Sequence, residues 1–281
     1  MTRISSQFCA GVFLDGGFAA KRLLLGARRV RRTRLYGVGA PKSGTNSVAA
    51  MFTSNVRARH EPEWHALIRV LLDRHHGRIG ERDFIEWLRA RDRRLALEVD
   101  SSALNFDILD ILLREFPDAR FLLTVRDCYS FLDSQVNQFL RGLGRRDPIV
   151  IELWNVQLGA NAYHYAPQER ILEQYGAPNV DALLRRWAHH VHHALATVPV
   201  ERLLVVRTDQ LNSRAFEIAD FAGLPRRTVR LERTHANRNP AKRPIVSEID
   251  REFLERKVEQ HCEPLMARFF PEIQSLDDVK I

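Results

Sequence analysis

The stretch LYGVGAPKSGTNSVAAMF, residues 35–52, joins an apolar run to a Gly-, Ser- and Thr-rich turn and then to a helix-forming pattern. A loop that follows a strand can aim consecutive backbone N–H groups at one point, and a helix beginning near Thr45 adds the positive end of its dipole. Lys42 lies inside the turn and adds a full positive charge. We therefore expect this turn to bind an anion of the phosphate type.

The order of residues in the turn excludes two common phosphate-binding motifs. A Walker A loop ends in Gly-Lys-Ser/Thr, whereas here Lys42 precedes Gly44. Gly37, Gly39 and Gly44 do not have the spacing of the dinucleotide-binding motif either.

The segment from Pro41 to Val48, PKSGTNSV, resembles the 5'-phosphosulfate-binding loop of sulfotransferases that use 3'-phosphoadenosine 5'-phosphosulfate (PAPS). The resemblance implies that Lys42 binds the phosphosulfate and stabilises the leaving group during catalysis. It also implies that the residues after Lys42 donate N–H and hydroxyl hydrogen bonds to the nucleotide, namely Ser43, Gly44, Thr45, Asn46 and Ser47.

A second element, DARFLLTVRDCYSFLDSQVNQFL at residues 118–140, reads as a buried strand followed by an amphipathic helix. It resembles the 3'-phosphate-binding element of the same family, in which an Arg at the strand end and a Ser eight residues later hold the phosphate. Arg126 and Ser134 have this spacing. The planar guanidinium suits the role because it can donate two charge-assisted hydrogen bonds to one phosphate. The family usually has Pro where this chain has Cys128.

The apolar runs alternate with helical patterns, which predicts an α/β fold with a central parallel sheet and helices on both faces, the P-loop-like sulfotransferase fold. Ligands of such sheets bind at the carboxyl ends of the strands, where Lys42 and Arg126 fall. The expected strands are 34–38, 95–99, 121–125 and 203–206, and the expected helices are 106–116, 129–141, 180–198, 214–222 and 248–269.

Length and composition predict one enzyme domain. The 281 residues are 45% hydrophobic, which is enough to bury a large core. We expect residues 1–32 to form a basic N-terminal extension and residues 33–281 to form a single sulfotransferase domain. Within it, residues 142–179 carry Trp154, Tyr163, His164, Tyr165 and Tyr175. This segment is either an insertion that forms the acceptor site or a helical subdomain that packs on the core.

The net charge of +8 indicates anionic ligands. A nucleic-acid partner is not expected, because the basic residues are not interleaved with aromatics as in a nucleic-acid-binding module. The apolar run at residues 8–14 ends at Asp15, so we expect no transmembrane segment and a cytoplasmic location. Three scattered cysteines indicate neither disulfides nor a zinc site. His189 and His193 are one helical turn apart, but they lie opposite the apolar stripe, and no metal is expected.

Sulfuryl transfer needs a base for the acceptor proton. The segment RARHEPEWH, residues 57–65, resembles a segment of glycan-modifying sulfotransferases whose Glu is the base, which makes Glu61 the first candidate. His60 is the alternative because its ordinary pKa near 6.5 suits proton transfer. A charged surface loop would also explain this segment.

Two further segments resemble family elements less closely. In LALEVDSS, residues 95–102, Glu98 is a candidate catalytic or substrate-binding residue, although a structural ion pair explains it equally well. In THANRNPAKRPI, residues 234–245, Lys242 and Arg243 resemble the basic loop that closes over the nucleotide. Asn237, Arg238 and Asn239 could line the same lid, and an ordinary basic surface loop is the alternative.

The resemblance implies a soluble sulfotransferase of bacterial type that moves a sulfuryl group from PAPS, without a metal, to a small-molecule or glycan acceptor. The acceptor group would be a hydroxyl, or as second choice an amine, of a glycan, lipid or natural product, as in secondary metabolism. One alternative is a P-loop-like ATP-dependent kinase, which would need magnesium and a Walker B partner. The other is a non-catalytic basic protein that binds nucleotides or nucleic acid.

Overall fold

The computed structural model describes residues 30–142, 147–234 and 243–279. The chain divides into two compact units, residues 1–31 and 32–281. All the helices and strands that the structure describes belong to the second unit.

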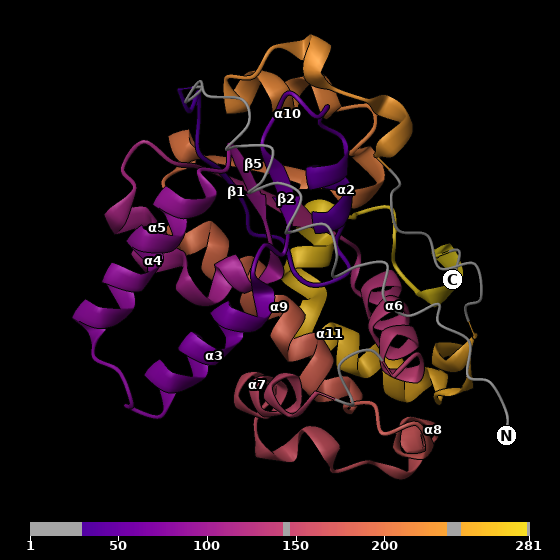
Figure 1. Cartoon of the computed structure of the whole chain (residues 1–281). Helices are drawn as coiled ribbons and strands as arrows, with labels where there is room; N and C mark the ends of the chain where they lie inside the picture. Colours follow the sequence, from indigo (N-terminus) through magenta and orange to yellow (C-terminus); the bar gives the residue numbers. More distant parts are fainter. Residues whose placement is uncertain (1–29, 143–146, 235–242, 280–281) are drawn as a thin grey trace, which may run out of the picture. The chain divides into compact units, whose positions relative to one another are not determined.

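Five parallel strands form the sheet, in the order β2-β3-β1-β4-β5 (Figure 1). Leu35 of the central strand β1 lies opposite Val99 of β3 on one side and Arg120 of β4 on the other. Parallel strands need crossover connections, and helices supply them here. The strands are β1 (Leu35–Gly37), β2 (Ala58–His60), β3 (Val99–Ser101), β4 (Arg120–Val125) and β5 (Leu203–Arg207).

Successive strand side chains point into two separate apolar clusters, one on each face of the sheet. Tyr36, Phe121 and Leu123 belong to the larger cluster, whereas Leu35 and Leu122 belong to the smaller one. Because both faces are buried, the strands read as continuous apolar runs in the sequence. The predicted α/β fold with helices on both faces is confirmed.

The larger cluster is covered by most of the helices, and the smaller cluster by two of them (Figure 1). The smaller face carries α2 (Thr45–Ala50) and α10 (Ala215–Ala222). The larger face carries α3 (Trp64–His75), α4 (Glu81–Leu95), α5 (Leu109–Glu115), α6 (Cys128–Leu140), α7 (Pro148–Leu158), α8 (Arg170–Gln174), α9 (Val180–Thr197) and α11 (Arg251–Phe269). None of the helices among the described residues is long and apolar enough to span a membrane.

Two strands differ from the sequence expectation. The expected strand 95–99 begins only at Val99, because helix α4 continues to Leu95 and ends with Ala96 in a left-handed conformation, φ 47°. Strand β2 was not expected at all. It is short, half-buried and at the sheet edge, and its charged residues Arg59 and His60 give no apolar run.

Two helices begin later than expected. The expected helix 106–116 starts as a 3-10 turn, Ala103–Ile108, and becomes α-helical at Leu109. The last helix begins at Arg251 rather than residue 248, because Asp250 is its N-cap and accepts a hydrogen bond from the Phe253 N–H at 2.8 Å.

Residues 147–179 form helices α7 and α8 with short 3-10 turns between them. Tyr163, Tyr165 and Tyr175 pack against the larger apolar cluster, and the Tyr165 hydroxyl donates to the Ala177 carbonyl at 2.8 Å. These tyrosines therefore act in packing. Trp154 packs against Phe139 of α6, with ring centroids 4.3 Å apart and ring planes tilted by 53°, and it also lines a cavity.

Candidate functional site

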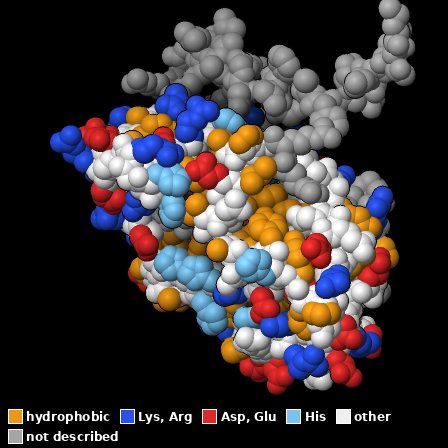
Figure 2. All heavy atoms as spheres, turned by 90° about the horizontal axis from the view of Figure 1, so that it is seen from below, with side chains coloured by type: hydrophobic (Ala, Val, Ile, Leu, Met, Phe, Trp, Pro, Cys, Tyr) orange, Lys and Arg blue, Asp and Glu red, His pale blue; other side chains and the backbone are white. Residues whose placement is uncertain are grey.

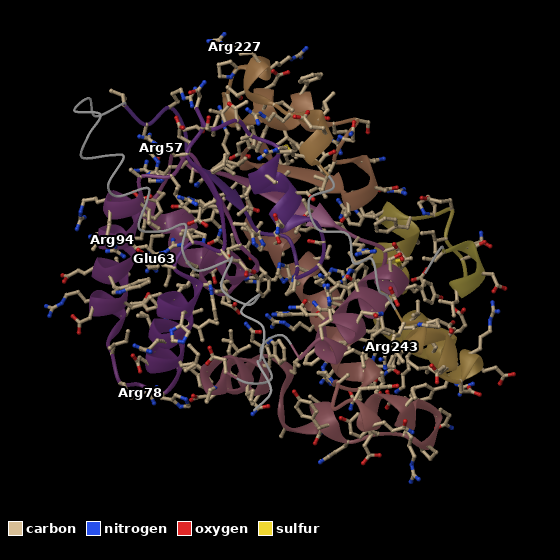
Figure 3. The ribbon with its side chains drawn as sticks, turned by 45° about the vertical axis from the view of Figure 1, so that its right-hand side comes forward. Arg57, Glu63, Arg78, Arg94, Arg227 and Arg243 are labelled. Atoms are coloured by element: carbon tan, nitrogen blue, oxygen red, sulfur yellow. The ribbon has the colours of Figure 1, made fainter. Side chains whose placement is uncertain are left out.

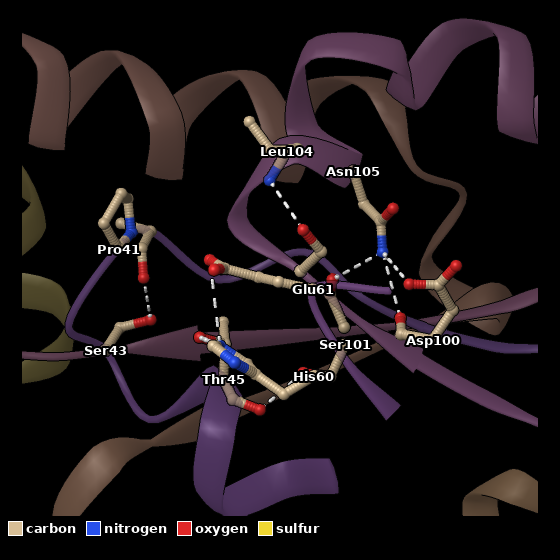
Figure 4. Close-up of polar contacts among 12 residues, drawn as sticks. Pro41, Ser43, Thr45, His60, Glu61, Asp100, Ser101, Leu104 and Asn105 are labelled. Atoms are coloured by element: carbon tan, nitrogen blue, oxygen red, sulfur yellow. Dashed lines mark hydrogen bonds and ion pairs between the residues drawn. The ribbon is translucent and has the colours of Figure 1, made fainter. Parts of the chain in front are cut away.

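The loop between β1 and α2 packs tightly against the end of β4. Ser43 Oγ donates to the Ala40 carbonyl at 2.7 Å (Figure 4). The same oxygen bonds Thr124 Oγ1 at 2.8 Å. A Cβ added at Gly39 would lie 1.9 Å from Thr124 Oγ1, so this approach needs glycine. Ser43 is 1% exposed, and its hydroxyl is therefore used to shape the loop.

The loop backbone is strained where it turns into α2. Lys42 has φ 67° and Gly44 has φ 102°, both in the left-handed region. For a non-glycine residue this conformation costs free energy. It persists only where the surrounding structure enforces it, which is often at functional sites. Here the Ser43 carbonyl accepts a hydrogen bond from Thr208 Oγ1 at 2.6 Å, which ties the strained turn to the end of β5.

Arg126 follows β4 and links its end to the loop. Its Nη1 donates to the Lys42 carbonyl at 3.2 Å, and its own carbonyl accepts from Trp187 Nε1 of α9 at 2.9 Å. Burial lowers the pKa of the Arg126 guanidinium, while the nearby carboxylates of Asp127 and Asp133 raise it. The structure thus brings the two predicted cationic ligands, Lys42 and Arg126, to one place at the carboxyl edge of the sheet.

Ser134 belongs to α6, whose first turn is fixed by its N-cap. The Asp127 carboxylate accepts from the Ser130 N–H at 2.7 Å. Cys128 occupies the first helical position, where a Pro would also be tolerated. Ser134 lies two turns further on and is 8% exposed. Arg126 and Ser134 are therefore both positioned by the rigid connection from β4 to α6.

His60 ends β2 at the same edge of the sheet as the loop. It pairs with Ser101 in the sheet, and its Nε2 lies 3.1 Å from Thr45 Oγ1, at the start of α2 (Figure 4). Glu61 Oε1 lies 3.8 Å from the same nitrogen. Burial lowers the pKa of His60 below its ordinary 6.5, and the nearby Lys42 lowers it too, whereas Glu61 and Asp100 raise it.

A buried network holds the segment after β2. Arg91 of α4 donates to the Pro62 carbonyl at 2.8 Å and to Asp100 at 2.9 Å. Glu61 and Glu63 both have positive φ, 46° and 53°. Glu63 forms a two-point ion pair with Arg94, at 2.6 and 3.1 Å, and Figure 3 shows the two residues together. Glu63 is therefore engaged by α4, whereas the Glu61 side chain is 39% exposed.

Glu98 does not join the loop. It precedes β3 and lies at the amino edge of the sheet, where Arg32 Nε and Nη2 bind it at 2.6 and 3.0 Å and the Arg57 N–H donates at 3.0 Å. Burial favours a raised pKa for Glu98, but the bonds from Arg32 and Arg57 bring the pKa below its ordinary value. The position supports the structural ion pair and not the catalytic or substrate-binding role.

Arg243 follows the predicted lid and is fixed to α6 by its backbone. Its N–H donates to Asn137 Oδ1 at 2.8 Å, and its carbonyl accepts from Asn137 Nδ2 at 3.0 Å. Its side chain is exposed (Figure 3). Lys242 and residues 237–239 lie outside the described residues.

The sequence interpretation missed His190, which is fully buried in α9. Its Nε2 bonds the Val38 carbonyl at 2.7 Å, and its ring stacks on Phe106 with centroids 3.9 Å apart. Burial lowers the pKa of His190 to about 3, so the ring is neutral. Its neighbour His189 is exposed, as expected. The helix carries four histidines in five positions. The only sequence signal that could have identified the buried one is its position relative to the apolar stripe of the helix.

Thr124 and Thr208 were also missed. Thr124 lies inside β4 and Thr208 directly follows β5, and both bond Ser43. No motif marks them, because their role depends on two strands meeting the loop in space. Among the described residues there is no group of three or more His, Cys, Asp or Glu side chains that could hold a metal ion.

The solved structures similar to this chain include a sulfotransferase and two sulfotransferase domains. A sulfotransferase from Alicyclobacillus acidocaldarius is 18% identical, with a TM-score of 0.49 over 86% of this chain and 99% of that chain. The sulfotransferase domain of the curacin biosynthetic pathway is 13% identical, with a TM-score of 0.44 over 81% and 96%. The sulfotransferase domain of the Synechococcus PCC 7002 olefin synthase is 16% identical, with a TM-score of 0.37 over 85% and 87%.

A search of curated proteins found no match. The comparison with protein families is decisive, because the sulfotransferase domain family matches residues 34–211, well over half of the chain. That range begins just before β1 and includes the loop, His60, Arg126 and Ser134. The chain belongs to the sulfotransferase domain family.

Proposed function

We propose that this sulfotransferase takes its sulfuryl group from PAPS and transfers it to a hydroxyl of a small-molecule or glycan acceptor. The observation that carries the proposal is the hydrogen bond from Arg126 Nη1 to the Lys42 carbonyl, which places the two cationic strand ends side by side. A nucleotide whose ribose carries both a 5'-phosphosulfate and a 3'-phosphate matches two adjacent cationic positions.

Each loop and helix residue has a proposed role toward this donor. Lys42 binds the phosphosulfate and stabilises the charge that develops on the leaving bisphosphate. Arg126 and Ser134 hold the 3'-phosphate. Lys242 and Arg243 are proposed to close over the nucleotide, since the Arg243 backbone is fixed to Asn137, one turn after Ser134. Hydrogen bonds from the start of α2 complete the site, supplied by Gly44, Thr45, Asn46 and Ser47, while Ser43 keeps the loop in shape.

The transfer is proposed as a direct displacement. The acceptor oxygen forms a bond to sulfur while the bond from sulfur to the bridging oxygen of PAPS breaks, and 3'-phosphoadenosine 5'-phosphate (PAP) leaves. The acceptor proton passes to a base. We now place His60 ahead of Glu61 in this role, because His60 Nε2 is 3.1 Å from Thr45 Oγ1 and its lowered pKa keeps the imidazole neutral and able to accept a proton. Glu61, at 3.8 Å, would stabilise the imidazolium that forms.

The surface charges favour a small anionic ligand over a nucleic acid. On the face shown in Figure 2, Lys and Arg side chains lie among Asp and Glu, and hydrophobic side chains gather in a hollow. Around α3 and α4, Arg74 pairs with Glu81 at 3.0 Å and Arg78 with Asp73 at 2.6 Å. Such neutralised cations differ from the continuous basic stripe that a nucleic acid needs.

Calorimetric titration with PAP and with ATP tests the proposal. We expect PAP to bind with a dissociation constant in the micromolar range, ATP to bind much more weakly, and Lys42→Ala to abolish measurable PAP binding. Arg227→Ala, an exposed substitution near the end of α10, serves as the control and should leave binding unchanged. Binding of ATP as tight as that of PAP would overturn the proposal in favour of a kinase.

A further inference from the structure

A cavity of about 60 Å³ lies beside the loop, between α6, α7 and α9. Ala40 and Pro41 form its loop side, and Trp154 and other apolar side chains form much of the remaining wall. Gln135 of α6 donates to the Pro41 carbonyl at 3.3 Å, which fixes this wall to the loop. Any molecule in the cavity therefore lies next to the residues that precede Lys42.

Arg186 of α9 also lines this cavity, and its side chain is only 14% exposed. Its nearest carboxylate among the described residues is that of Asp107, whose Oδ1 lies 3.8 Å from Arg186 Nη2. Asp107 instead accepts a hydrogen bond from Gln157 Nε2 at 2.9 Å. Within the described part of the chain, the Arg186 guanidinium donates no hydrogen bond. A nearly buried cation with unused donors in a cavity wall is poised to bind an anion.

Two buried acceptor atoms complete the wall. Gln138 Oε1 and His190 Nδ1 have no hydrogen-bond partner among the described residues, and both residues line the cavity. His190 Nε2 carries the ring proton, because its partner is the Val38 carbonyl, so Nδ1 is an acceptor. The cavity thus offers cationic donors at Arg186 and neutral acceptors at Gln138 and His190, which can receive a hydroxyl group.

We propose that this cavity binds the sulfuryl acceptor and that Arg186 selects acceptors carrying a carboxylate, so that the acceptor class is short-chain hydroxy acids. The inference rests on the proposed function, which it deepens by naming the substrate class. The carboxylate receives two parallel hydrogen bonds from the guanidinium. At about 15 Å³ for each water molecule, the cavity has room for about four waters, which fits a carboxylate on a short chain.

The hydroxyl of such an acceptor is held by Gln138 and His190, in the same cavity that Pro41 joins to the loop. In the transfer step this oxygen bonds sulfur, the bond from sulfur to the PAP oxygen breaks, and the hydroxyl proton moves to the base. The carboxylate is unchanged throughout. Because Pro41 and Arg186 line one small cavity, the hydroxyl and the carboxylate must be only a few bonds apart.

Saturation-transfer NMR with 3-hydroxypropanoate and its neutral amide, each with and without PAP, tests the inference. We expect the acid to bind at least about tenfold more tightly than the amide, which corresponds to the loss of one charged pairing. Arg186→Met should remove this preference and leave the amide unaffected. Arg185→Met, on the neighbouring exposed residue, is the matched control and should retain the preference.

Equal binding of the acid and the amide to the wild type, or an unchanged preference in Arg186→Met, would overturn the inference. If Arg186→Met does not fold, the comparison of acid with amide in the wild type and in Arg185→Met decides it. PAP binding reports separately on the proposed function. Acid selectivity without PAP binding would refute the donor proposal alone, and PAP binding without acid selectivity would refute the acceptor inference alone.

Discussion

Both edges of the sheet carry charged residues, but those at the amino edge form ion pairs, whereas two cationic residues meet at the carboxyl edge. At the amino edge, Arg32 and Glu98 form an ion pair at 2.6 Å, and Arg34 pairs with Asp118 at 2.6 Å. At the carboxyl edge, Lys42 and Arg126 come together at the loop. Lys42 and Gly44, in this loop, both have positive φ.

The difference shows that a charged residue at a strand end indicates function only when its edge is known. In parallel sheets the carboxyl edge collects the loops that bind ligands, and the amino edge is free to be neutralised for stability. At the carboxyl edge, by contrast, Arg126 is held by a main-chain carbonyl, that of Lys42.

The largest effect expected from this comparison is on PAP binding, which should depend on the arginine at the carboxyl edge and not on the arginine at the amino edge. Arg126→Ala should weaken PAP binding by about 100-fold, because two charge-assisted hydrogen bonds of about 1.5 kcal/mol or more each are lost. Arg32→Ala should leave PAP binding unchanged and lower only the melting temperature. Calorimetry and thermal unfolding measure both. If the two substitutions weaken PAP binding equally, the assignment of the ligand to the carboxyl edge is wrong.

The next effect tests whether the tight loop itself positions the ligand. Gly39→Ala places a Cβ 2.5 Å from Ser43 Oγ and closer still to Thr124, so we expect a loss of about 1–3 kcal/mol of stability, as for overpacking. PAP affinity should fall as well, because the loop must move. Gly80→Ala is the matched control, since an added Cβ there meets nothing within 4 Å. Denaturant unfolding and PAP titration compare the two, and normal PAP affinity in Gly39→Ala would show that the loop tolerates displacement.

A smaller effect is expected at the amino edge. Glu98→Gln should cost about 1 kcal/mol at neutral pH, a modest value because the Arg32 side chain is 37% exposed and solvent screens the pair. The folded-state pKa of Glu98 lies below its ordinary value of 4.5. Its contribution is therefore present above pH 4.5 and is lost as the pH falls through the lower folded-state pKa.

Urea unfolding of the wild type and Glu98→Gln across this pH range measures the contribution of the carboxylate. The two proteins should converge in stability in acid and differ at neutral pH. A difference that stays constant across the range would mean that the Glu98 charge is not coupled to folding. PAP binding should be the same in both proteins at neutral pH.

The sequence was sufficient for features that are encoded locally. The residues from Pro41 to Val48 predicted the loop. The apolar runs predicted β1, β4, β5 and the two-sided sheet, and they placed β3 four residues too early. Strand β2 could not be predicted, because its pairing with β3 depends on contacts far apart in the chain. For the same reason Glu98 could not be assigned to an edge, since the strand was expected to start four residues earlier.

The residues that complete the site could not be predicted either, because their roles also depend on contacts between distant parts of the chain. His190, Arg186 and Thr208 matter because they meet the loop or its cavity in space, and their sequence neighbours carry no motif. Periodicity could place His190 on a helix, but it could not say that its Nε2 would bond the Val38 carbonyl.

The smallest expected effect sharpens the comparison within the carboxyl edge, between Glu61 and Glu63. Glu61 raises the pKa of His60 from 3.8 Å away, whereas Glu63 is held by Arg94. Glu61→Gln should therefore lower the His60 pKa further by a small amount, and Glu63→Gln should leave it unchanged. NMR titration measures this, with the His60 signal assigned by its loss in His60→Gln. An equal decrease in both variants would mean that His60 responds to the general negative charge of the segment, and Glu61 would lose its place as the partner of the proposed base.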